Sequence, residues 1–301
     1  VADLVFAGPL DTFGNASSVH WAGQAARRRL ERARARVARH FDRRPADVIF
    51  TSGGTEADNL ALFGVLTHRA VGARRLVTSA VEHPAVRAAA LVLVEHGVEV
   101  VEVGVDDQGR LDLEALDRAL EVPTGLVSIM AVNNETGVIH PTDEVVKRAH
   151  RAGALVHVDA VQAVGRLPID AKPDFITISG HKLGGLRGVG ALIVRESATL
   201  QARMVGGPQE RGHRAGTEPV ALAESLSVAL DLAEDARMTE MPRLEALRDR
   251  LDECLDSLDG VRRLGARRVA NTTCAVFRGV DGESVLQGLD LEGIACSSGS
   301  A

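Results

Sequence analysis

One lysine, Lys182, follows a short apolar segment of the chain. Residues 175–178 are apolar or β-branched and predict a buried strand, and Ser179, His181 and Lys182 follow it ahead of a glycine-rich turn. Burying an ammonium group is costly, so packing alone does not favour a lysine here. A Schiff base to an aldehyde cofactor needs such a partly desolvated amine, and a structural or phosphate-contacting lysine is the alternative interpretation.

Lysine is rare in this chain, which makes each lysine informative. Of the 35 basic residues, only Lys147, Lys172 and Lys182 are lysines, and the rest are arginines. Lys147 falls on a helical pattern and Lys172 precedes a proline in a loop, so both have ordinary explanations. Because arginine does not form an imine at neutral pH, Lys182 is the candidate catalytic amine.

Polar residues also follow the other predicted strands. Strands alternate with helices along the chain, which predicts an α/β fold with a mostly parallel sheet flanked by helices. Ligands of such sheets bind at the carboxyl ends of the strands. The side chains expected at that edge are Thr55, His83, Asn134, Asp159, Gln162, Ser179, His181 and Lys182. Each alone has a structural explanation, such as a turn or a helix cap, but their joint position indicates one site.

The spacing of apolar residues predicts the elements that position these side chains. Strands are expected at residues 48–51, 75–79, 98–103, 126–132, 155–158, 175–178 and 189–194. Helices are expected at residues 22–41, 84–96, 112–121, 141–152, 219–234 and 242–258, and after the turn at residues 52–55. Thr55 is the expected N-cap of the helix that follows the turn at residues 52–55, with Asp58 completing a capping box. The glycine-lined start of this helix is a ready anion site.

The chain is long enough for two domains, and its pattern changes after residue 238. We expect a large domain at residues 14–238 and a smaller α+β domain formed by residues 1–13 and 239–301. The smaller domain is expected to contain a strand at residues 272–277, a helix at 282–289 and a final strand at 294–296.

Composition and charge argue against several classes of partner. The net charge of −6 at pH 7 gives no reason to expect a nucleic acid or an anionic membrane as a partner. No stretch is long and apolar enough to predict a transmembrane span, and no signal-peptide pattern is present. The three cysteines lack CxxC spacing, which argues against a disulfide or zinc framework and favours a reducing cytoplasm.

The motifs together resemble those of the cysteine desulfurases, which are class V aminotransferases with the type I fold of pyridoxal-phosphate (PLP) enzymes. They follow the family's order over nearly the whole chain. The matching segments are FGNASSVH (13–20), TSGGTEADNLAL (51–62), EHPAV (82–86), NNETG (133–137), HVDAVQAVG (157–165), SGHKLGG (179–185), ERGHRAGTEP (210–219) and DLEGIACSSGSA (290–301). The resemblance implies PLP as the cofactor and Lys182 as the residue that binds it.

The resemblance also implies the roles of the catalytic residues. Lys182 would form the Schiff base with PLP and later move protons as the free amine. Asp159 would pair with the pyridinium nitrogen and make the ring an electron sink. His83 would stack on the ring face, while Asn134 and Gln162 would face the ring oxygen and the substrate.

The same resemblance implies how the cofactor phosphate is held and which partners the chain has. Gly54, Thr55, Ser179 and His181 would bind the phosphate through a helix N-terminus and hydroxyl donors. Thr217 would reach the phosphate of the neighbouring subunit, which implies a homodimer. L-cysteine would be the substrate, and a sulfur-acceptor or scaffold protein the partner.

The end of the sequence departs from the family's pattern. The cysteine that takes the sulfur follows the SSGSA motif directly in the family, which is the position after Ala301 here. Cys296 lies earlier, at the end of a predicted strand, where a buried packing cysteine is expected. The family's carboxylate-binding arginine and its opening motif have no counterpart in this sequence. A chain that ends at Ala301 is expected to hold PLP but to transfer sulfur poorly, unless it is part of a longer protein.

We therefore expect a PLP-dependent cysteine desulfurase that converts L-cysteine to L-alanine and an enzyme-bound persulfide. The sulfur would serve iron–sulfur cluster assembly or tRNA thiolation. Two alternatives stay open. One is a related PLP-dependent lyase or aminotransferase without a sulfur relay, and the other is a non-catalytic PLP-fold subunit that binds a partner.

Overall fold

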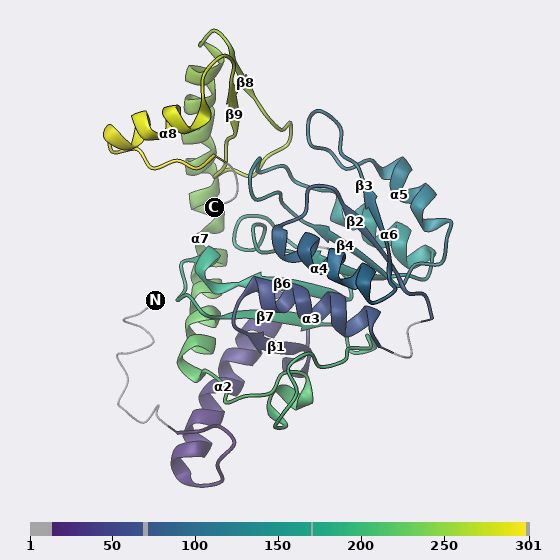
Figure 1. The fold of residues 1–301 in the computed structure, drawn as a ribbon. Coiled ribbons are helices and arrows are strands. Elements are labelled where there is room, and N and C mark those ends of the chain that lie inside the picture. Colours follow the sequence, from purple (N-terminus) through teal and green to yellow (C-terminus); the bar gives the residue numbers. More distant parts are fainter. Residues whose placement is uncertain (1–13, 69–71, 170, 299–301) are drawn as a thin grey trace.

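The protein is built around one sheet of seven strands in the computed structural model, and its strands are spread one above another in Figure 1. The structure describes residues 14–68, 72–169 and 171–298. The strand order is β1-β7-β6-β5-β4-β2-β3. The strands are β1 (Val48–Thr51), β2 (Arg75–Ser79), β3 (Glu99–Val103), β4 (Leu126–Met130), β5 (Leu155–Asp159), β6 (Phe175–Ser179) and β7 (Gly190–Val194).

Strand direction places the predicted site residues on one edge of this sheet. Neighbouring strands run parallel except at β7, which is antiparallel to both β6 and β1. The register sets Asp159 beside Met130 on one side and beside Thr177 on the other. The carboxyl ends of β1, β2, β4, β5 and β6 therefore meet at the same edge, and the predicted mostly parallel α/β sheet is confirmed.

Helices cover both faces of the sheet. One face is covered by α3 (Gly54–Leu66) and α4 (Pro84–Glu95), and the other by α2 (Trp21–His40), α5 (Leu113–Leu120), α6 (Thr142–Arg151) and the first part of α7 (Val220–Asp256). Along β1, Ile49 packs in the core under α3 and α4, while Phe50 packs in the opposite core. This alternation is expected for a strand that is buried on both faces.

A short 3-10 helix, η2 (Gly180–Leu183), continues β6 beyond the sheet edge and carries Lys182. Gly184 ends η2 with a φ of 79°, in the left-handed region that glycine adopts without strain. Two more 3-10 helices are η1 (Pro45–Asp47) and η3 (Gln209–Gly212). The backbone thus turns sharply after β6, and Lys182 lies directly above the strand end.

The prediction that Thr55 caps α3 is wrong. The helix begins at Gly54 with Gly53 as its N-cap, and no side chain caps it. The first helical position lies close to Val161 and suits glycine, because a Cβ at Gly54 would lie 2.9 Å from the Val161 side chain. Asp58 belongs to no capping box and is buried instead. The first turn of α3 therefore has no side-chain cap at the sheet edge.

The two helices predicted at residues 219–234 and 242–258 are one helix, α7, of 37 residues. Pro242 lies inside it and is exposed. A proline in a helix interior removes one backbone hydrogen bond, but the carbonyl left without a donor can be hydrated where the helix surface is exposed. The predicted domain boundary at residue 239 falls inside α7, and the division into two domains stays a prediction.

The last described part of the chain lies beside the C-terminal half of α7 (Figure 1). Strands β8 (Val261–Arg263) and β9 (Ala275–Phe277) form an antiparallel pair, and α8 (Gly282–Leu291) follows. β8 was not predicted because its side chains are mostly charged, and the predicted strand at residues 294–296 is absent from the structure. The other predicted elements are present, with small shifts at their ends. No described helix is long and apolar enough to cross a membrane.

Replacing Pro242 tests whether α7 is continuous. We expect Pro242→Ala to raise the free energy of unfolding by about 1–3 kcal/mol, because alanine restores the missing backbone hydrogen bond. Urea denaturation followed by circular dichroism measures this change, with the exposed Met238→Ala variant as the control. A loss of stability in Pro242→Ala would show instead that the proline ends one helix and begins another.

Candidate active site

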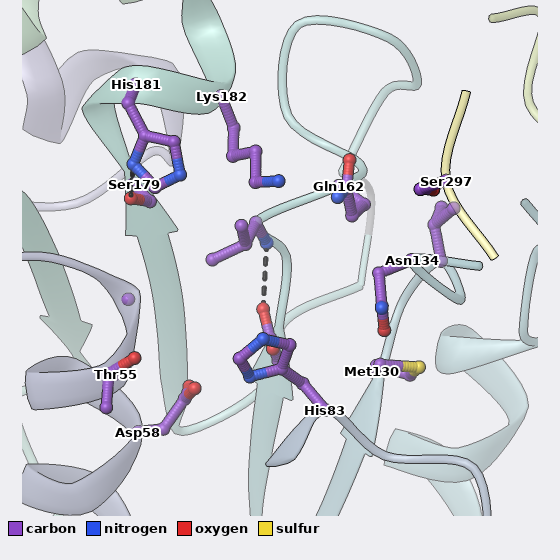
Figure 2. Close-up of a pocket in the computed structure, with 14 residues that line it drawn as sticks. Thr55, Asp58, His83, Met130, Asn134, Gln162, Ser179, His181, Lys182 and Ser297 are labelled. Carbon is purple, nitrogen blue, oxygen red and sulfur yellow. Dashed lines mark hydrogen bonds between the residues drawn. The ribbon is translucent and has the colours of Figure 1, made fainter. Parts of the chain in front are cut away.

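A cavity of about 420 Å³ lies at the carboxyl edge of the sheet (Figure 2). The predicted residues that line it are Gly54, Thr55, His83, Asn134, Asp159, Gln162, Ser179, His181 and Lys182. Further residues that the sequence did not predict also line it: Asp58, Met130, Val132, Val161 and Ser297. Thr217 does not line it and is exposed. The structure thus brings together every predicted site residue except Thr217.

Lys182 reaches into this cavity from η2, on the side opposite Asp58 and Thr55 of α3 (Figure 2). The backbone carbonyl of Lys182 accepts a hydrogen bond from Arg166 Nη2 at 3.0 Å, which holds the turn in place. Burial lowers the pKa of His83 and the positive charge of Lys182 lowers it further, while the same charge offsets part of the rise that burial causes in the pKa of Asp159. The amine is therefore close enough to act electrostatically on two other groups of the cavity.

Asp159 ends β5 as a buried carboxyl group. Its Oδ1 accepts the Val161 N–H at 2.9 Å. Burial raises the pKa of Asp159 to about 6, although the Val161 hydrogen bond and the Lys182 charge act in the opposite direction. The group is thus ionised at pH 7, and a buried carboxylate of this kind can pair with a cationic ring nitrogen.

His83 is the N-cap of α4, and its position fixes the state of its ring. Its Nδ1 accepts the Ala85 N–H at 3.1 Å. Burial, and then the charge of Lys182, lowers the pKa of His83. The ring is therefore neutral at pH 7 and carries its proton on Nε2, because Nδ1 is used as an acceptor.

The first turn of α3 and the end of β6 form a site suited to an anion. Gly54 and Thr55 begin the helix, whose N-terminal N–H groups favour negative charge. On the opposite side Ser179 Oγ and His181 Nδ1 lie 3.0 Å apart. Burial, together with nearby cationic side chains, lowers the pKa of His181. A phosphate group would find backbone and hydroxyl donors here.

Asn133 supports the site without lining it. Its Oδ1 accepts hydrogen bonds from the N–H groups of Glu135 (3.1 Å) and Thr136 (2.9 Å), and its Nδ2 donates to the Val81 carbonyl at 3.0 Å. The side chain thereby fastens the turn after β4 to the turn after β2, and Asn134 faces the cavity from this turn. The Asn-Asn pair in the sequence is the signal that could have identified this support.

Two buried polar residues, His157 of β5 and Asp58 of α3, lie close together, and Asp58 also lines the cavity. His157 is fully buried, with Nδ1 2.8 Å from Ser128 Oγ and Nε2 2.9 Å from Thr177 Oγ1. Burial lowers the pKa of His157 to about 3, so it is neutral. Asp58 lies 3.6 Å from His157 Nε2, and burial together with the Asp159 charge raises the pKa of Asp58 well above its usual value. Burial thus favours the protonated form of Asp58.

Glu82 is a second buried carboxyl group that sequence reasoning did not single out. Its Oε1 accepts from Ser79 Oγ at 2.6 Å and from the Met130 N–H at 3.0 Å, so it joins the ends of β2 and β4. Burial raises its pKa to about 8. Only its place in the fold shows this, because an isolated glutamate before a helix is ordinarily exposed.

The expectation that Cys296 is a buried packing residue at a strand end is wrong. Cys296 is exposed, and no strand forms at residues 294–296. The segment instead runs past the cavity, where Ser297 lines it (Figure 2). An extended apolar triplet predicts a strand only where another strand can pair with it, and none does so in the described part of the chain.

Comparisons with known proteins agree with this site. The family described as Aminotransferase class-V matches residues 10–301. A cysteine desulfurase of Gluconacetobacter diazotrophicus is 43% identical over 310 residues, covering 97% of this chain and 74% of that protein. The structure of a NifS-like protein has a TM-score of 0.93 at 32% identity, covering 98% of this chain and 82% of that chain. The structure of SspA in complex with cysteine has a TM-score of 0.85 at 28% identity, covering 100% and 85%.

The chain belongs to the class V aminotransferase family, and its relatives within that family are cysteine desulfurases. The predicted resemblance is confirmed, and PLP is the cofactor of this family. The cavity fits PLP by its chemistry, since Lys182 offers an amine, Asp159 a buried carboxylate and the first turn of α3 an anion site.

The raised pKa of Glu82 predicts how stability depends on pH. A carboxyl group whose pKa is higher in the folded than in the unfolded state binds more protons when folded, so stability falls as pH rises from its unfolded pKa towards 8. Glu82→Gln removes this loss. At pH 7 we expect the apoprotein variant to be more stable than the wild type by about 3 kcal/mol, and at pH 4 by close to none. Urea denaturation at several pH values measures this, and parallel pH curves for the two proteins would contradict it.

Proposed function

We propose that the chain is a PLP-dependent cysteine desulfurase that converts L-cysteine to L-alanine and passes the sulfur to a protein thiol. The observation that carries this proposal is the joint position of Lys182, Asp159 and His83 around one cavity, each at or just beyond the carboxyl end of a different strand. The desulfurase relatives and the cysteine complex of SspA support L-cysteine as the substrate.

Two ends of the cavity would hold the two ends of the cofactor. PLP, when bound, supplies an aldehyde for the substrate amine and a ring that withdraws electrons. Asp159 would face the ring nitrogen, where its negative charge at pH 7 favours the protonated ring. The phosphate would lie against the first turn of α3, within reach of Ser179 and His181. Asn134 and Gln162 would face the ring oxygen and the substrate.

Lys182 and His83 would handle the protons. Lys182 Nζ would hold the cofactor before the substrate amine takes its place, and would then remove the proton from the substrate α carbon. His83 would lie against the face of the ring. Its neutral state leaves a proton on Nε2, which it could donate or recover during the reaction.

The sulfur step requires a thiolate. It would attack the substrate sulfur, the bond from that sulfur to the β carbon would break, and its electron pair would stay on the β carbon until a proton completes alanine. The family pattern places this thiol at the position after Ala301. Cys296 is exposed next to Ser297 of the cavity, but it does not line the cavity itself.

We also propose an oligomeric state, a cellular location and a partner for the protein. Thr217 is exposed, as expected if it contacts the cofactor phosphate of a second subunit, so the working form would be a homodimer. The three cysteines of the sequence, which form no disulfide in the structure, suit a cytoplasmic protein. A sulfur-acceptor or scaffold protein would take the persulfide sulfur for iron–sulfur cluster assembly or tRNA thiolation.

Replacing Lys182 tests the proposed activity. Lys182→Arg keeps the positive charge but removes the primary amine, so we expect sulfide and alanine formation to fall by about a thousandfold or more. The measurement is sulfide and alanine, in equal amounts for the wild type, from L-cysteine and a reductant. Lys172→Arg is the control, because Lys172 is exposed and paired with Asp42 at 3.2 Å.

The same assay separates the alternatives. Pyruvate, ammonia and sulfide without alanine would indicate a related lyase, and a 2-keto acid that keeps the sulfur would indicate an aminotransferase. A cofactor absorbance that does not respond to L-cysteine would indicate a non-catalytic PLP-binding subunit. Undiminished desulfuration in Lys182→Arg would contradict the proposal.

A second variant tests the source of the thiol. We expect Cys296→Ser to keep the rate of sulfide formation within about twofold of the wild type, because Cys296 faces solvent and only its neighbour lines the cavity. Mass spectrometry of the protein after a single turnover shows which cysteine carries the added sulfur. A persulfide on Cys296, together with loss of activity in Cys296→Ser, would make this residue the nucleophile.

A further inference from the structure

The loop at residues 210–217 has a backbone that its surroundings must hold in place. Glu210 (φ 46°, ψ 37°) and Arg211 (φ 58°, ψ 30°) are consecutive non-glycine residues in the left-handed region. Such residues are strained, and they persist only where other contacts determine the conformation. Two sets of contacts do so here, and both lead towards the proposed phosphate site.

Glu210 is the first anchor of the loop. The Arg34 guanidinium of α2 binds both of its carboxylate oxygens, at 2.6 and 2.8 Å, and all of these groups are buried. Glu210 Oε2 also accepts the Phe50 N–H at 3.0 Å. Phe50 lies in β1, just before the turn that begins α3. The strained backbone is therefore fastened to the strand that leads into the phosphate site.

Arg214 is the second anchor, and it acts on the phosphate site more directly. Its Nε lies 2.8 Å from Glu56 Oε1 and its Nη2 lies 3.3 Å from Glu56 Oε2. Glu56 Oε2 also accepts the Ser52 N–H at 2.8 Å. Glu56 follows Thr55 in the first turn of α3, so one carboxylate joins the loop to both sides of the Gly53-Gly54 turn.

The far end of the loop lies outside the lining of this subunit's cavity. Thr217 follows Arg214 closely, is exposed and does not line the cavity. The neighbouring Ala215 N–H donates to the Met204 carbonyl at 3.1 Å, and Met204 and Val205 are exposed apolar residues, 46% and 82% accessible. The loop is thus fixed to its own phosphate turn, while its other end is presented outwards beside apolar side chains.

We propose that loop 210–217 is a clamp that couples the two cofactor sites of the homodimer, with Glu210 and Arg214 as its positioning residues. The clamp holds the phosphate turn of its own subunit through Glu56 and Phe50, and holds Thr217 in position for the partner's cofactor. This inference rests on the proposed function, in which Thr217 contacts the cofactor phosphate of the other subunit.

The first experiment measures cofactor release from the holoenzyme. Arg214→Met keeps the length of the side chain but removes its charge and its hydrogen bonds, and we expect PLP to dissociate about five- to tenfold faster. Arg29→Met is the matched control, because it breaks the Arg29–Glu224 ion pair, which is as buried as Arg214–Glu56 but lies between α2 and α7. Loss of the visible cofactor band after dilution into a PLP-trapping buffer gives the rate.

The control separates positioning from general stability. We expect both variants to unfold at similarly lowered temperatures, but only Arg214→Met to release PLP faster. Equal release rates in the two variants, or an unchanged rate in Arg214→Met, would overturn the clamp. Glu210 is left intact in these experiments, because removing it would strand the buried charge of Arg34 and could unfold the protein.

The second experiment uses hybrid dimers with one altered chain, purified through two different affinity tags. One Arg214→Met chain disturbs its own phosphate turn and also the Thr217 that reaches the partner, so we expect both sites to lose PLP faster. One Thr217→Ala chain disturbs only the partner's site, so we expect one fast and one slow phase. A single fast phase of half amplitude with the Arg214→Met hybrid would overturn the coupling.

The Thr217 variant also separates the proposed dimeric cofactor site from the proposed clamp. If Thr217→Ala in both chains leaves PLP release unchanged, the contact across the dimer is absent, and the proposed homodimeric site fails together with the coupling. If Thr217→Ala speeds release and Arg214→Met does not, the dimeric site stands and the clamp alone is refuted.

Discussion

The approach of the Lys182 amine to the buried Asp159 carboxylate is the interaction on which the rest of the site depends. Burial raises the pKa of this carboxyl group to about 6, while the Val161 hydrogen bond and the lysine charge act in the opposite direction. The parallel pairing of β5 with β6 sets the two strand ends side by side, and η2 then brings Lys182 over the edge. A shift of register between these strands would separate the pair.

The site is surrounded by ionisable groups that the fold keeps neutral. Asp58 and Glu82 are buried carboxyl groups whose pKa values are raised, while His157 and His83 have lowered pKa values. This leaves Asp159, with a pKa of about 6, as the ionised carboxyl group among the described residues that line the cavity. A carboxyl group whose pKa is raised by folding lowers the free energy of unfolding at neutral pH. Functional sites often contain groups that reduce stability in this way.

The sequence predicted the sheet and most of the cavity because both depend on local patterns. Apolar runs mark the strands, and polar residues such as Asp159 and Lys182 follow them directly. Predictions failed where tertiary context decides the outcome. α3 begins at Gly54, one residue before Thr55, and exposure lets α7 continue through Pro242. Within the described residues no strand pairs with residues 294–296, and Cys296 is exposed. The neutral state of Glu82 also depends on burial that no local pattern shows.

The most direct test of the account is to find which residue binds PLP. The holoenzyme would be reduced with borohydride, digested, and analysed by mass spectrometry for a peptide that carries the pyridoxyl group. Because the sequence contains only three lysines, the assignment is unambiguous. We expect the pyridoxyl group on Lys182 alone. A pyridoxyl group on Lys147 or Lys172, or none after reduction of a protein that shows the cofactor band, would contradict it.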